Sequence, residues 1–219
     1  MLKKQVVSSE MFNIIKILQS NSLFDNHVLA GGTALAFQIG HRISTDMDLF
    51  TSENQNALQL MEFFRKTFKK VDIASANDSY LQIFINNIKI EIVHDDYAMV
   101  RNPVIEDNIR MFDKSEISAM KIRAIQGRTK ARDFIDLAYL LQELSLKNMF
   151  EIYKEKYGSI SEKMIKRTML TKCKSIKNNE WLVDIKMLRN DIKPEDVLKC
   201  IEKGIEDYNK DNNIGKSVT

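Results

Sequence analysis

The residues of this chain whose types and spacing suit chemistry lie within one stretch, LAGGTALAFQIGHRISTDMDLF, residues 29–50. It begins with the glycine pair Gly31 and Gly32 and ends with Asp46 and Asp48, which one residue separates. A glycine pair before a helix lets the backbone approach a phosphate closely, and the helix N-terminus adds the positive end of its dipole. Carboxylate oxygens at this spacing suit Mg²⁺, which also offsets their mutual repulsion. Each feature alone is common, but together they indicate phosphoryl or nucleotidyl transfer.

Three local elements must bring the two ends of this stretch together. The apolar run HVLA (27–30) predicts a buried strand that stops at the glycines, and TALAFQIG (33–40) predicts a helix that ends at Gly40. The alternating TDMDLFT (45–51) predicts a strand. Because side chains alternate along a strand, Asp46 and Asp48 should point to the same face. Arg42, just before this strand, is a candidate to offset their charge.

The rest of the chain divides into a mixed first half and a helical second half. We predict a two-residue hairpin turn at Asn86-Asn87, and Pro194 suits the first turn of the last helix. Further helices are predicted at 9–22, 56–70, 115–127, 132–144 and near 194–208, and further strands at 71–76, 80–86 and 88–94. The expected fold is α+β: a mixed β-sheet flanked by helices in a catalytic core, residues 1–114, followed by a C-terminal helical bundle, residues 115–219.

Composition favours a protein of the reducing cytoplasm. Hydrophobic residues make up 44% of the chain, and no apolar run approaches the roughly 20 residues that span a bilayer. The N-terminus has lysines but no apolar core after them, so we do not expect a secretory signal. Cys173 and Cys200 lack metal-ligand spacing and are expected to be free thiols.

Positive charge is concentrated in residues 147–186, which we call the basic segment. It holds 10 Lys/Arg against 5 Asp/Glu, whereas residues 1–146 hold 17 against 18. A solvated helix face is the ordinary explanation, and a contact surface for a polyanion such as RNA is the alternative.

The spacing from Gly31-Gly32 to Asp46-Met47-Asp48, with 13 residues between, resembles the nucleotidyltransferase signature of the DNA polymerase beta superfamily. The longer segment GGTALAFQIGHRISTDMDLF, residues 31–50, resembles the corresponding segment of the AbiEii/AbiGii toxin family of that superfamily. The resemblance continues in SAMKIRAIQGRTKARDFIDLAYLL, residues 118–141, and the matching blocks frame roughly residues 25–145. Its matching positions there are Lys121, Arg128, Asp133 and Asp136.

The superfamily resemblance implies a third carboxylate on a neighbouring strand. Glu91 is the only acid within IKIEIVH (88–94), opposite the isoleucine face, and we assign it this role. Asp95 competes if the strand runs further.

By the same resemblance, Asp46, Asp48 and Glu91 would hold two Mg²⁺ ions, and Gly31, Gly32 and Thr33 would hold the phosphates of a nucleoside triphosphate. Lys121 and Arg128 would contact the triphosphate. Asp133 could serve as a helix N-cap and Asp136 could pair with Arg132, and we weigh these structural roles equally with a catalytic one.

The leading hypothesis is therefore a magnesium-dependent nucleotidyltransferase of the toxin type that modifies RNA such as tRNA, with a separately encoded antitoxin. Two alternatives stay open: a transferase that acts on a small molecule, as antibiotic-modifying enzymes of the superfamily do, and an inactive nucleotide-binding module. The basic segment disfavours the former, and the presence of all three acids disfavours the latter.

Overall fold

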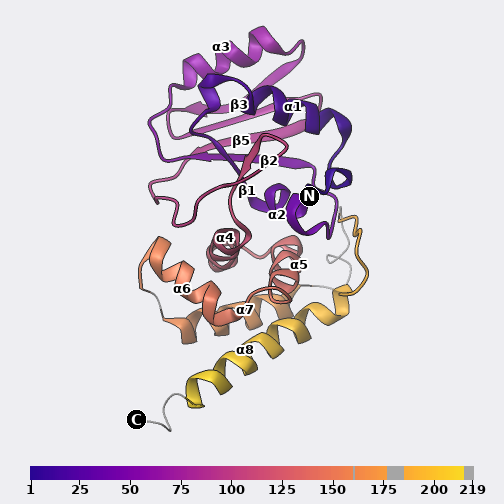
Figure 1. Cartoon of the computed structure of the whole chain (residues 1–219), viewed down its shortest axis with the longest axis vertical. Coiled ribbons are helices and arrows are strands. Elements are labelled where there is room, and N and C mark those ends of the chain that lie inside the picture. Colours follow the sequence, from indigo (N-terminus) through magenta and orange to yellow (C-terminus); the bar gives the residue numbers. More distant parts are fainter. Residues whose placement is uncertain (160, 177–184, 215–219) are drawn as a thin grey trace. The chain divides into compact units, whose positions relative to one another are not determined.

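The structure is a computed structural model that describes residues 1–159, 161–176 and 185–214 (Figure 1). The chain divides into two compact units, Met1–Asp113 and Lys114–Thr219. Unit 1 carries all the strands of the described chain, and unit 2 is helical there. The predicted α+β fold, a mixed sheet with helices, is confirmed.

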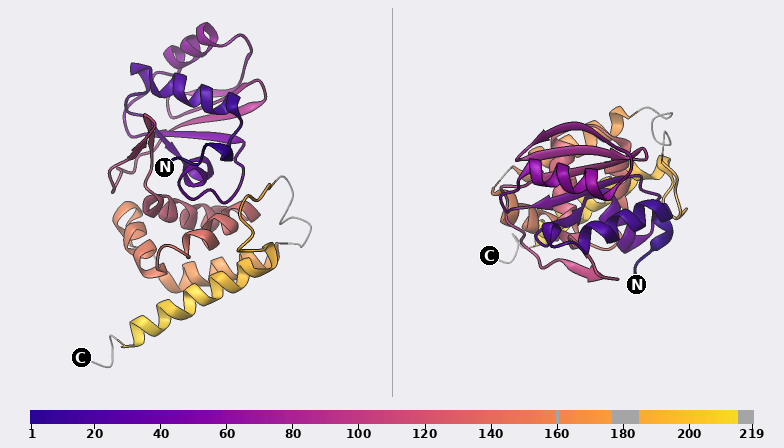
Figure 2. Two further views of the ribbon diagram at one scale, coloured as in Figure 1. Left: turned by 45° about the vertical axis from the view of Figure 1, so that its right-hand side comes forward. Right: turned by 90° about the horizontal axis from the view of Figure 1, so that it is seen from above.

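Unit 1 is built on a seven-stranded sheet in the order β3-β4-β5-β2-β1-β7-β6. Figure 1 shows α1 and α3 on one side of the strands and α2 on the other, and the left view of Figure 2 agrees. The strands are β1 Val28–Ala30, β2 Asp46–Thr51, β3 Val71–Asn77, β4 Tyr80–Ile85, β5 Ile88–His94, β6 Val104–Glu106 and β7 Ile109–Met111. The helices are η1 Lys4–Val6, α1 Ser9–Gln19, η2 Ser22–Phe24, α2 Gly31–Ile39 and α3 Ala57–Thr67.

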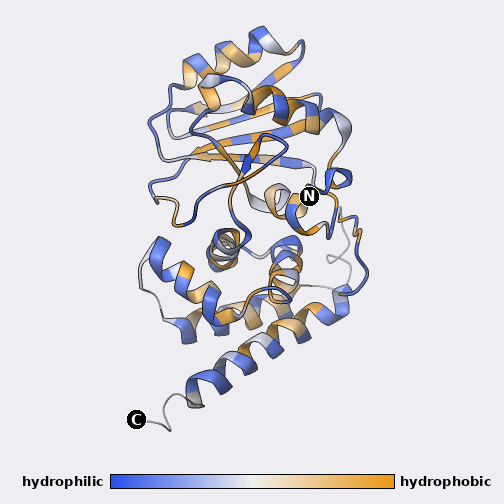
Figure 3. Cartoon of the chain, in the orientation of Figure 1, coloured by the Kyte–Doolittle hydropathy of each residue, from blue (hydrophilic) through white to orange (hydrophobic). Residues whose placement is uncertain are grey.

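Alternation of apolar and polar side chains explains the central strands, and Figure 3 shows it as alternating colours along them. In β2, Met47 and Leu49 are completely buried, whereas Asp46 and Asp48 on the opposite face are half-buried. β2 pairs with β5 in parallel and with β1 in antiparallel orientation. The sheet therefore has one face buried in the core and one face that carries acids.

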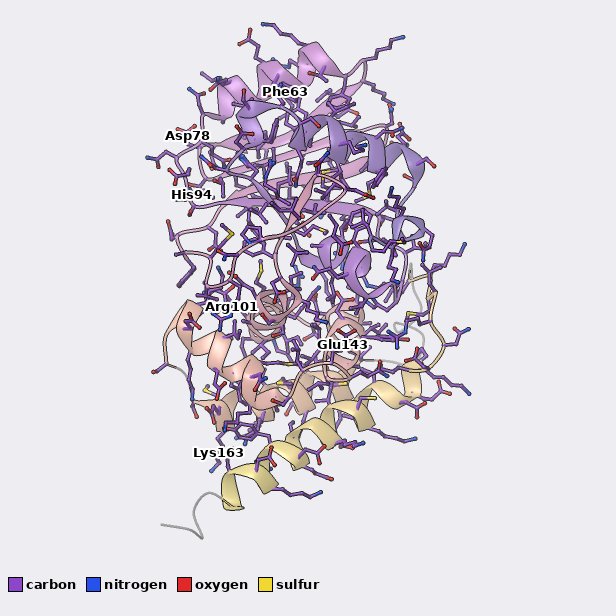
Figure 4. All side chains as sticks on the ribbon, viewed as in Figure 1. Phe63, Asp78, His94, Arg101, Glu143 and Lys163 are labelled. Carbon is purple, nitrogen blue, oxygen red and sulfur yellow. The ribbon has the colours of Figure 1, made fainter. Side chains whose placement is uncertain are left out.

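Local turn chemistry was predicted correctly where the residues have distinct backbone preferences. Asn86 and Asn87 have φ angles of 48° and 69°, the positive values that a tight hairpin turn requires. Gly40 ends α2 with φ of 70°. Asp78, labelled in Figure 4, accepts a hydrogen bond of 3.1 Å from the backbone N–H of Ala57 and so holds the start of α3.

One hairpin was not predicted. β6 and β7 pair through a turn at Asp107 and Asn108, whose φ angles are also positive, 52° and 61°. β7 then pairs in parallel with β1 through Leu29 and Met111. Strands of three residues are too short for alternation to be visible in the sequence.

Unit 2 is organised around α4, which packs against α5, α6 and α7. Its helices are α4 Lys114–Gly127, α5 Ala131–Leu140, α6 Leu146–Tyr157, α7 Glu162–Ser175, η4 Pro194–Asp196 and α8 Val197–Ile214. Pro194 occupies the predicted first-turn position, whereas α5 ends four residues before the predicted 144. Cys173 and Cys200 are free thiols. Among the residues that the structure describes, no helix is both long enough and apolar enough to cross a membrane.

Candidate active site

The glycine turn lies directly against one of the two aspartates. Gly31 has φ of 63°, and a Cβ atom placed on it would lie 2.3 Å from Oδ2 of Asp48. A side chain at this position would therefore displace the carboxylate. Ala30, the N-cap of α2, offers no side-chain acceptor to the N–H groups of the first turn. The arrangement places helix N–H groups beside a carboxylate, which suits a metal-bound phosphate.

The sheet register gathers the acids. Asp48 is paired with Ala30 of β1 on one side and with Glu91 of β5 on the other. Because paired residues on neighbouring strands share a face, Asp46, Asp48 and Glu91 face the same side of the sheet. The structure thus places the three acids selected from the sequence on one face of the sheet.

Glu91 is held by two neighbours as well as by Asp48. Lys89 donates to Oε2 of Glu91 at 2.6 Å, and the Tyr80 hydroxyl donates to Oε1. Burial alone would raise the pKa of Glu91, but hydrogen bonds with Lys89, Tyr80 and Asp48 outweigh it and lower the pKa. Burial and the Glu91 hydrogen bond raise the pKa of Tyr80 to about 12. Glu91 is therefore an ionised carboxylate and Tyr80 a neutral donor at neutral pH.

Lys89, like Tyr80, is a site residue that the sequence patterns did not reveal. It is paired with Asp46 across the strands, and its Nζ lies 3.8 Å from Oδ2 of Asp46. The role of Arg42 in offsetting the acids stays a prediction, whereas Lys89 contacts two of them in the structure. The sequence alone predicts that Lys89 shares a strand face with Glu91, two residues later. Its pairing with Asp46 follows only from the parallel register of β2 and β5.

Thr33 has a different environment from the one expected of a phosphate ligand. Its side chain is 1% exposed, and its hydroxyl lies 2.8 Å from Oγ of Ser44 and also donates to the backbone carbonyl of Asp46. The hydroxyl thus ties α2 to the start of β2. Because the hydroxyl is engaged in these contacts, Thr33 would contact a phosphate through its backbone N–H.

Asp95, the competitor for the third acid, lies beyond β5. Its backbone N–H donates to the carbonyl of Thr51 at 2.8 Å, next to the end of β2. It is four residues past Glu91, which corresponds to about 13 Å along an extended strand. Asp95 is therefore too far from Asp48 to share a metal ion with it.

In unit 2, the four residues of the downstream block form a cluster of charges. Nζ of Lys121 lies 2.9 Å from Oδ1 of Asp133 and 2.6 Å from Oδ2 of Asp136, and all three side chains are buried. Arg128 contacts Oδ2 of Asp133 at 2.7 Å, and its own side chain is 47% exposed. The suggested N-cap role of Asp133 is wrong, because Lys130 is the N-cap of α5.

The electrostatics of this cluster favour its ionised form. Burial alone would raise the pKa of Asp133, but the charge of Lys121, followed by the hydrogen bond and charge of Arg128, lowers it. Asp136 pairs with Lys121, a partner that was not expected from the sequence. The cluster fixes the position of Lys121, and Arg128 keeps an exposed surface.

Part of the basic segment serves internal structure. Lys156 forms a fully buried ion pair with Glu116 at 2.9 Å. Lys172 donates to the carbonyls of Ile125 and Gln126 and so satisfies the end of α4. The cations that stay exposed include Lys147, Lys163 and Arg167, of which Lys163 is labelled in Figure 4. Residues 177–184 of the segment lie outside the described residues.

The donor set fits magnesium in kind. Asp46, Asp48 and Glu91 offer only carboxylate oxygens, the ligands that Mg²⁺ prefers. In the described parts of the chain, however, no three His, Cys, Asp or Glu side chains are gathered closely enough to hold a metal ion. Both carboxylate oxygens of Glu91 accept hydrogen bonds, Oε1 from Tyr80 and Oε2 from Lys89.

Comparisons with known proteins identify a sequence relative and solved structures with a similar fold. The chain is 26% identical over 171 residues to an uncharacterized protein, aq_aa25, of Aquifex aeolicus (strain VF5), a match that covers 75% of this chain and 82% of that protein. JHP933 from Helicobacter pylori has a similar fold, with a TM-score of 0.56, 18% identity, and coverage of 97% and 99% of the two chains. A putative nucleotidyltransferase from H. pylori gives a TM-score of 0.55 at 18% identity, with coverage of 91% and 94%.

A family model decides the assignment. The model described as nucleotidyl transferase AbiEii toxin, type IV TA system, matches residues 16–203, which is most of the chain. The match includes the glycine turn, β2, β5 and the charge cluster of unit 2. The chain therefore belongs to the AbiEii family of nucleotidyltransferase toxins of type IV toxin–antitoxin systems, and the protein is a nucleotidyltransferase.

Proposed function

We propose that the protein transfers a nucleoside monophosphate from a nucleoside triphosphate to an acceptor hydroxyl in a reaction that depends on Mg²⁺. One observation carries this proposal: the turn at Gly31 lies against Asp48, and Asp48 is in register with Glu91. A phosphate held at this turn would have carboxylates beside it, and a divalent cation held by these carboxylates would neutralise its charge.

The chain's own residues have distinct roles in this proposal. Gly31, Gly32 and the backbone of Thr33 bind the phosphates through the first turn of α2. Asp46, Asp48 and Glu91 would hold up to two Mg²⁺ ions, which supply charge neutralisation at the phosphates and a lower pKa for the attacking hydroxyl.

Lys121 and Arg128 are the proposed contacts for the triphosphate. Asp133 and Asp136 hold the ammonium group of Lys121 at 2.9 Å and 2.6 Å. Arg128 has a side chain that is 47% exposed, so part of its guanidinium surface is accessible. We assign Asp133 and Asp136 to positioning these cations.

We propose RNA, such as tRNA, as the acceptor. Exposed cations of the basic segment, among them Lys147, Lys163 and Arg167, support a polyanion contact. Membership of a type IV toxin family favours a cognate antitoxin, and we expect the protein to act in the cytoplasm, where triphosphates and tRNA are available.

A transfer assay tests the proposal. The protein is incubated with Mg²⁺, total RNA and each of the four α-³²P-labelled nucleoside triphosphates, followed by sequencing of the RNA 3′ ends. We expect one triphosphate to label RNA, and Asp48→Ala to abolish the labelling. Equal labelling by the parent and Asp48→Ala, or none with any triphosphate, contradicts the proposal.

Two further arms separate the alternatives. Labelling of a small-molecule pool, in the absence of RNA labelling, indicates a small-molecule transferase. An inactive binding module gives no transfer to either pool, yet it shows nucleotide binding in a calorimetric titration with Mg²⁺.

A further inference from the structure

Lys89 lies between two of the acids because of the sheet register. It is directly across from Asp46 on β2 and two residues before Glu91 on its own strand, and all three share one face. Its Nζ lies 2.6 Å from Oε2 of Glu91 and 3.8 Å from Oδ2 of Asp46. Since the pairing of strands fixes the backbone, a change of rotamer moves the ammonium group but leaves Lys89 on this face.

The ammonium group of Lys89 reduces the repulsion among the carboxylates, as a bound metal ion would. Asp46, Asp48 and Glu91 repel one another when ionised, and a cation within about 4–6 Å of a carboxylate stabilises its charged form. The three side chains Lys89, Asp46 and Glu91 are each about one quarter exposed, so water screens this attraction only in part. A divalent ion needs the oxygens of Asp46 and Glu91, which Lys89 already contacts.

The flexible stem of lysine makes the ammonium group displaceable. Four carbons separate it from the backbone, so it can leave the carboxylates for solvent without a change in the strand. A divalent ion carries twice the charge and prefers carboxylate oxygens. The two cations are therefore alternatives at the same oxygens.

We propose that Lys89 is a resident counter-ion that competes with the divalent cation for Asp46 and Glu91, and thereby sets the cation concentration at which the site fills. This inference rests on the proposed function, since it takes the acids to be the metal site. It predicts that Lys89 holds the acids together when metal is scarce and moves aside when metal binds.

Binding of Mn²⁺ to the full-length protein without nucleotide tests the inference, with free Mn²⁺ measured by electron paramagnetic resonance. We expect Lys89→Gln to lower the Kd for Mn²⁺ about fivefold or more, because one positive charge leaves the site. Lys89→Arg keeps the charge and should stay within about twofold of the parent. Lys66→Gln is the matched control, since Lys66 pairs with Glu62 at 2.5 Å on α3. An unchanged Kd in Lys89→Gln overturns the inference.

A measurement on the parent protein covers the case in which Lys89→Gln does not fold. Lysines are acetylated briefly with an amine-reactive reagent, with and without Mn²⁺, and quantified by mass spectrometry. We expect labelling of Lys89 to rise about threefold with Mn²⁺ while labelling of Lys66 stays constant, because the displaced ammonium group becomes accessible. Equal labelling of Lys89 in both conditions contradicts the inference.

Asp48→Asn separates failure of this inference from failure of the proposed function. If Asp48→Asn abolishes Mn²⁺ binding while Lys89→Gln changes nothing, the metal site stands and only the role of Lys89 is wrong. If the parent and Asp48→Asn bind Mn²⁺ equally, the acids do not hold the metal, and both ideas fail.

Discussion

At the scale of single residues, Gly31 is subject to two constraints at once. Its φ of 63° disfavours any side chain, and the space for a Cβ is occupied by the carboxylate of Asp48. Gly158 has a positive φ of 81° but nothing within 4 Å of its Cβ position. Gly127 has neither constraint. These three positions allow backbone strain and displacement of the carboxylate to be measured separately.

We expect Gly31→Ala and Gly158→Ala each to lose about 1–3 kcal/mol of stability, since both force alanine to a positive φ. Only Gly31→Ala should lose transfer activity, by about 100-fold, because Asp48 must turn away from the methyl group. Gly127→Ala should match the parent. Urea denaturation and the labelled-nucleotide assay measure these outcomes, and an active Gly31→Ala contradicts the placement of Asp48 in the site.

Thr33 gives the second prediction at this scale. Thr33→Val removes a buried hydroxyl and leaves Ser44 and the carbonyl of Asp46 without it, so we expect a loss of about 1–3 kcal/mol in stability. Thr33→Ser keeps the hydroxyl and should stay close to the parent. Urea denaturation and steady-state kinetics together distinguish a structural hydroxyl from one that binds phosphate. A raised KM for the triphosphate with unchanged stability would instead indicate a hydroxyl that binds phosphate.

Residue identities at the site could be predicted from the sequence because their types are unusual and their spacing is short. Asp46, Asp48 and the glycines lie within one stretch of local structure. Lys89 could not be found in this way, because lysine on a strand is ordinary and its partner Asp46 is 43 residues away. Thr33 was assigned by proximity to the glycines, and only the packing of α2 against β2 shows where its hydroxyl points.

At the scale of elements, α4 and α5 are joined by charges as well as by apolar contacts. Lys121 of α4 contacts Asp133 and Asp136 of α5, and all three side chains are buried. An ion pair in such surroundings costs more to break than an exposed one, because the remaining charge has no water to solvate it. Asp191 with Arg189 offers the contrast, since these side chains are 42% and 38% exposed.

We expect Asp133→Asn to lower the free energy of unfolding by about 3–5 kcal/mol at pH 7. The folded-state pKa of Asp133 is lowered, so its contribution is complete above the unfolded value near 3.9 and disappears as pH falls through the folded value. The difference between parent and variant should therefore shrink as the pH is lowered below about 4. Urea denaturation at several pH values measures it.

Asp191→Asn is the control for this prediction. The pKa of Asp191 is also low, about 2, chiefly because of its hydrogen bond with Arg189. Its exposure limits the effect to about 1 kcal/mol or less. A cost as large as that of Asp133→Asn would show that burial does not decide the strength of these pairs.

The long elements were predictable because their patterns repeat several times within each. Strands β2, β4 and β5 alternate over six or seven residues. The β6–β7 hairpin has three residues in each strand, and its place beside β1 depends on one parallel pairing, Leu29 with Met111. The boundary predicted between a catalytic core, residues 1–114, and a C-terminal helical domain, residues 115–219, stays a prediction.

At the scale of the whole molecule, the distribution of charge matters more than its sum. The net charge of +3 includes cations that serve internal contacts, such as Lys156 with Glu116 and Lys172 with the end of α4. Counting lysines in a sequence therefore overestimates the surface available to a polyanion. The exposed cations are the ones that a nucleic acid can reach.

We expect the triple variant Lys147→Gln, Lys163→Gln, Arg167→Gln to raise the KM for an RNA acceptor about tenfold, while the KM for the triphosphate stays constant. The dependence of the RNA KM on salt should also become weaker. Steady-state transfer kinetics at about 50 and about 200 mM salt measure both effects. An unchanged RNA KM would contradict the proposed contact surface and favour a small acceptor.

The parallel pairing of β2 with β5 has a consequence for how the protein becomes active. Parallel neighbours need a long crossover in the chain. Here α3, β3 and β4 come between β2 and β5 in the sequence. The β3-β4-β5 meander can form from local contacts, whereas Asp48 meets Glu91 only after a loop of 43 residues has closed. We therefore expect catalytic competence to appear late in refolding, after most strand structure has formed. A newly synthesised chain would then lack its assembled set of acids until one of its last folding steps.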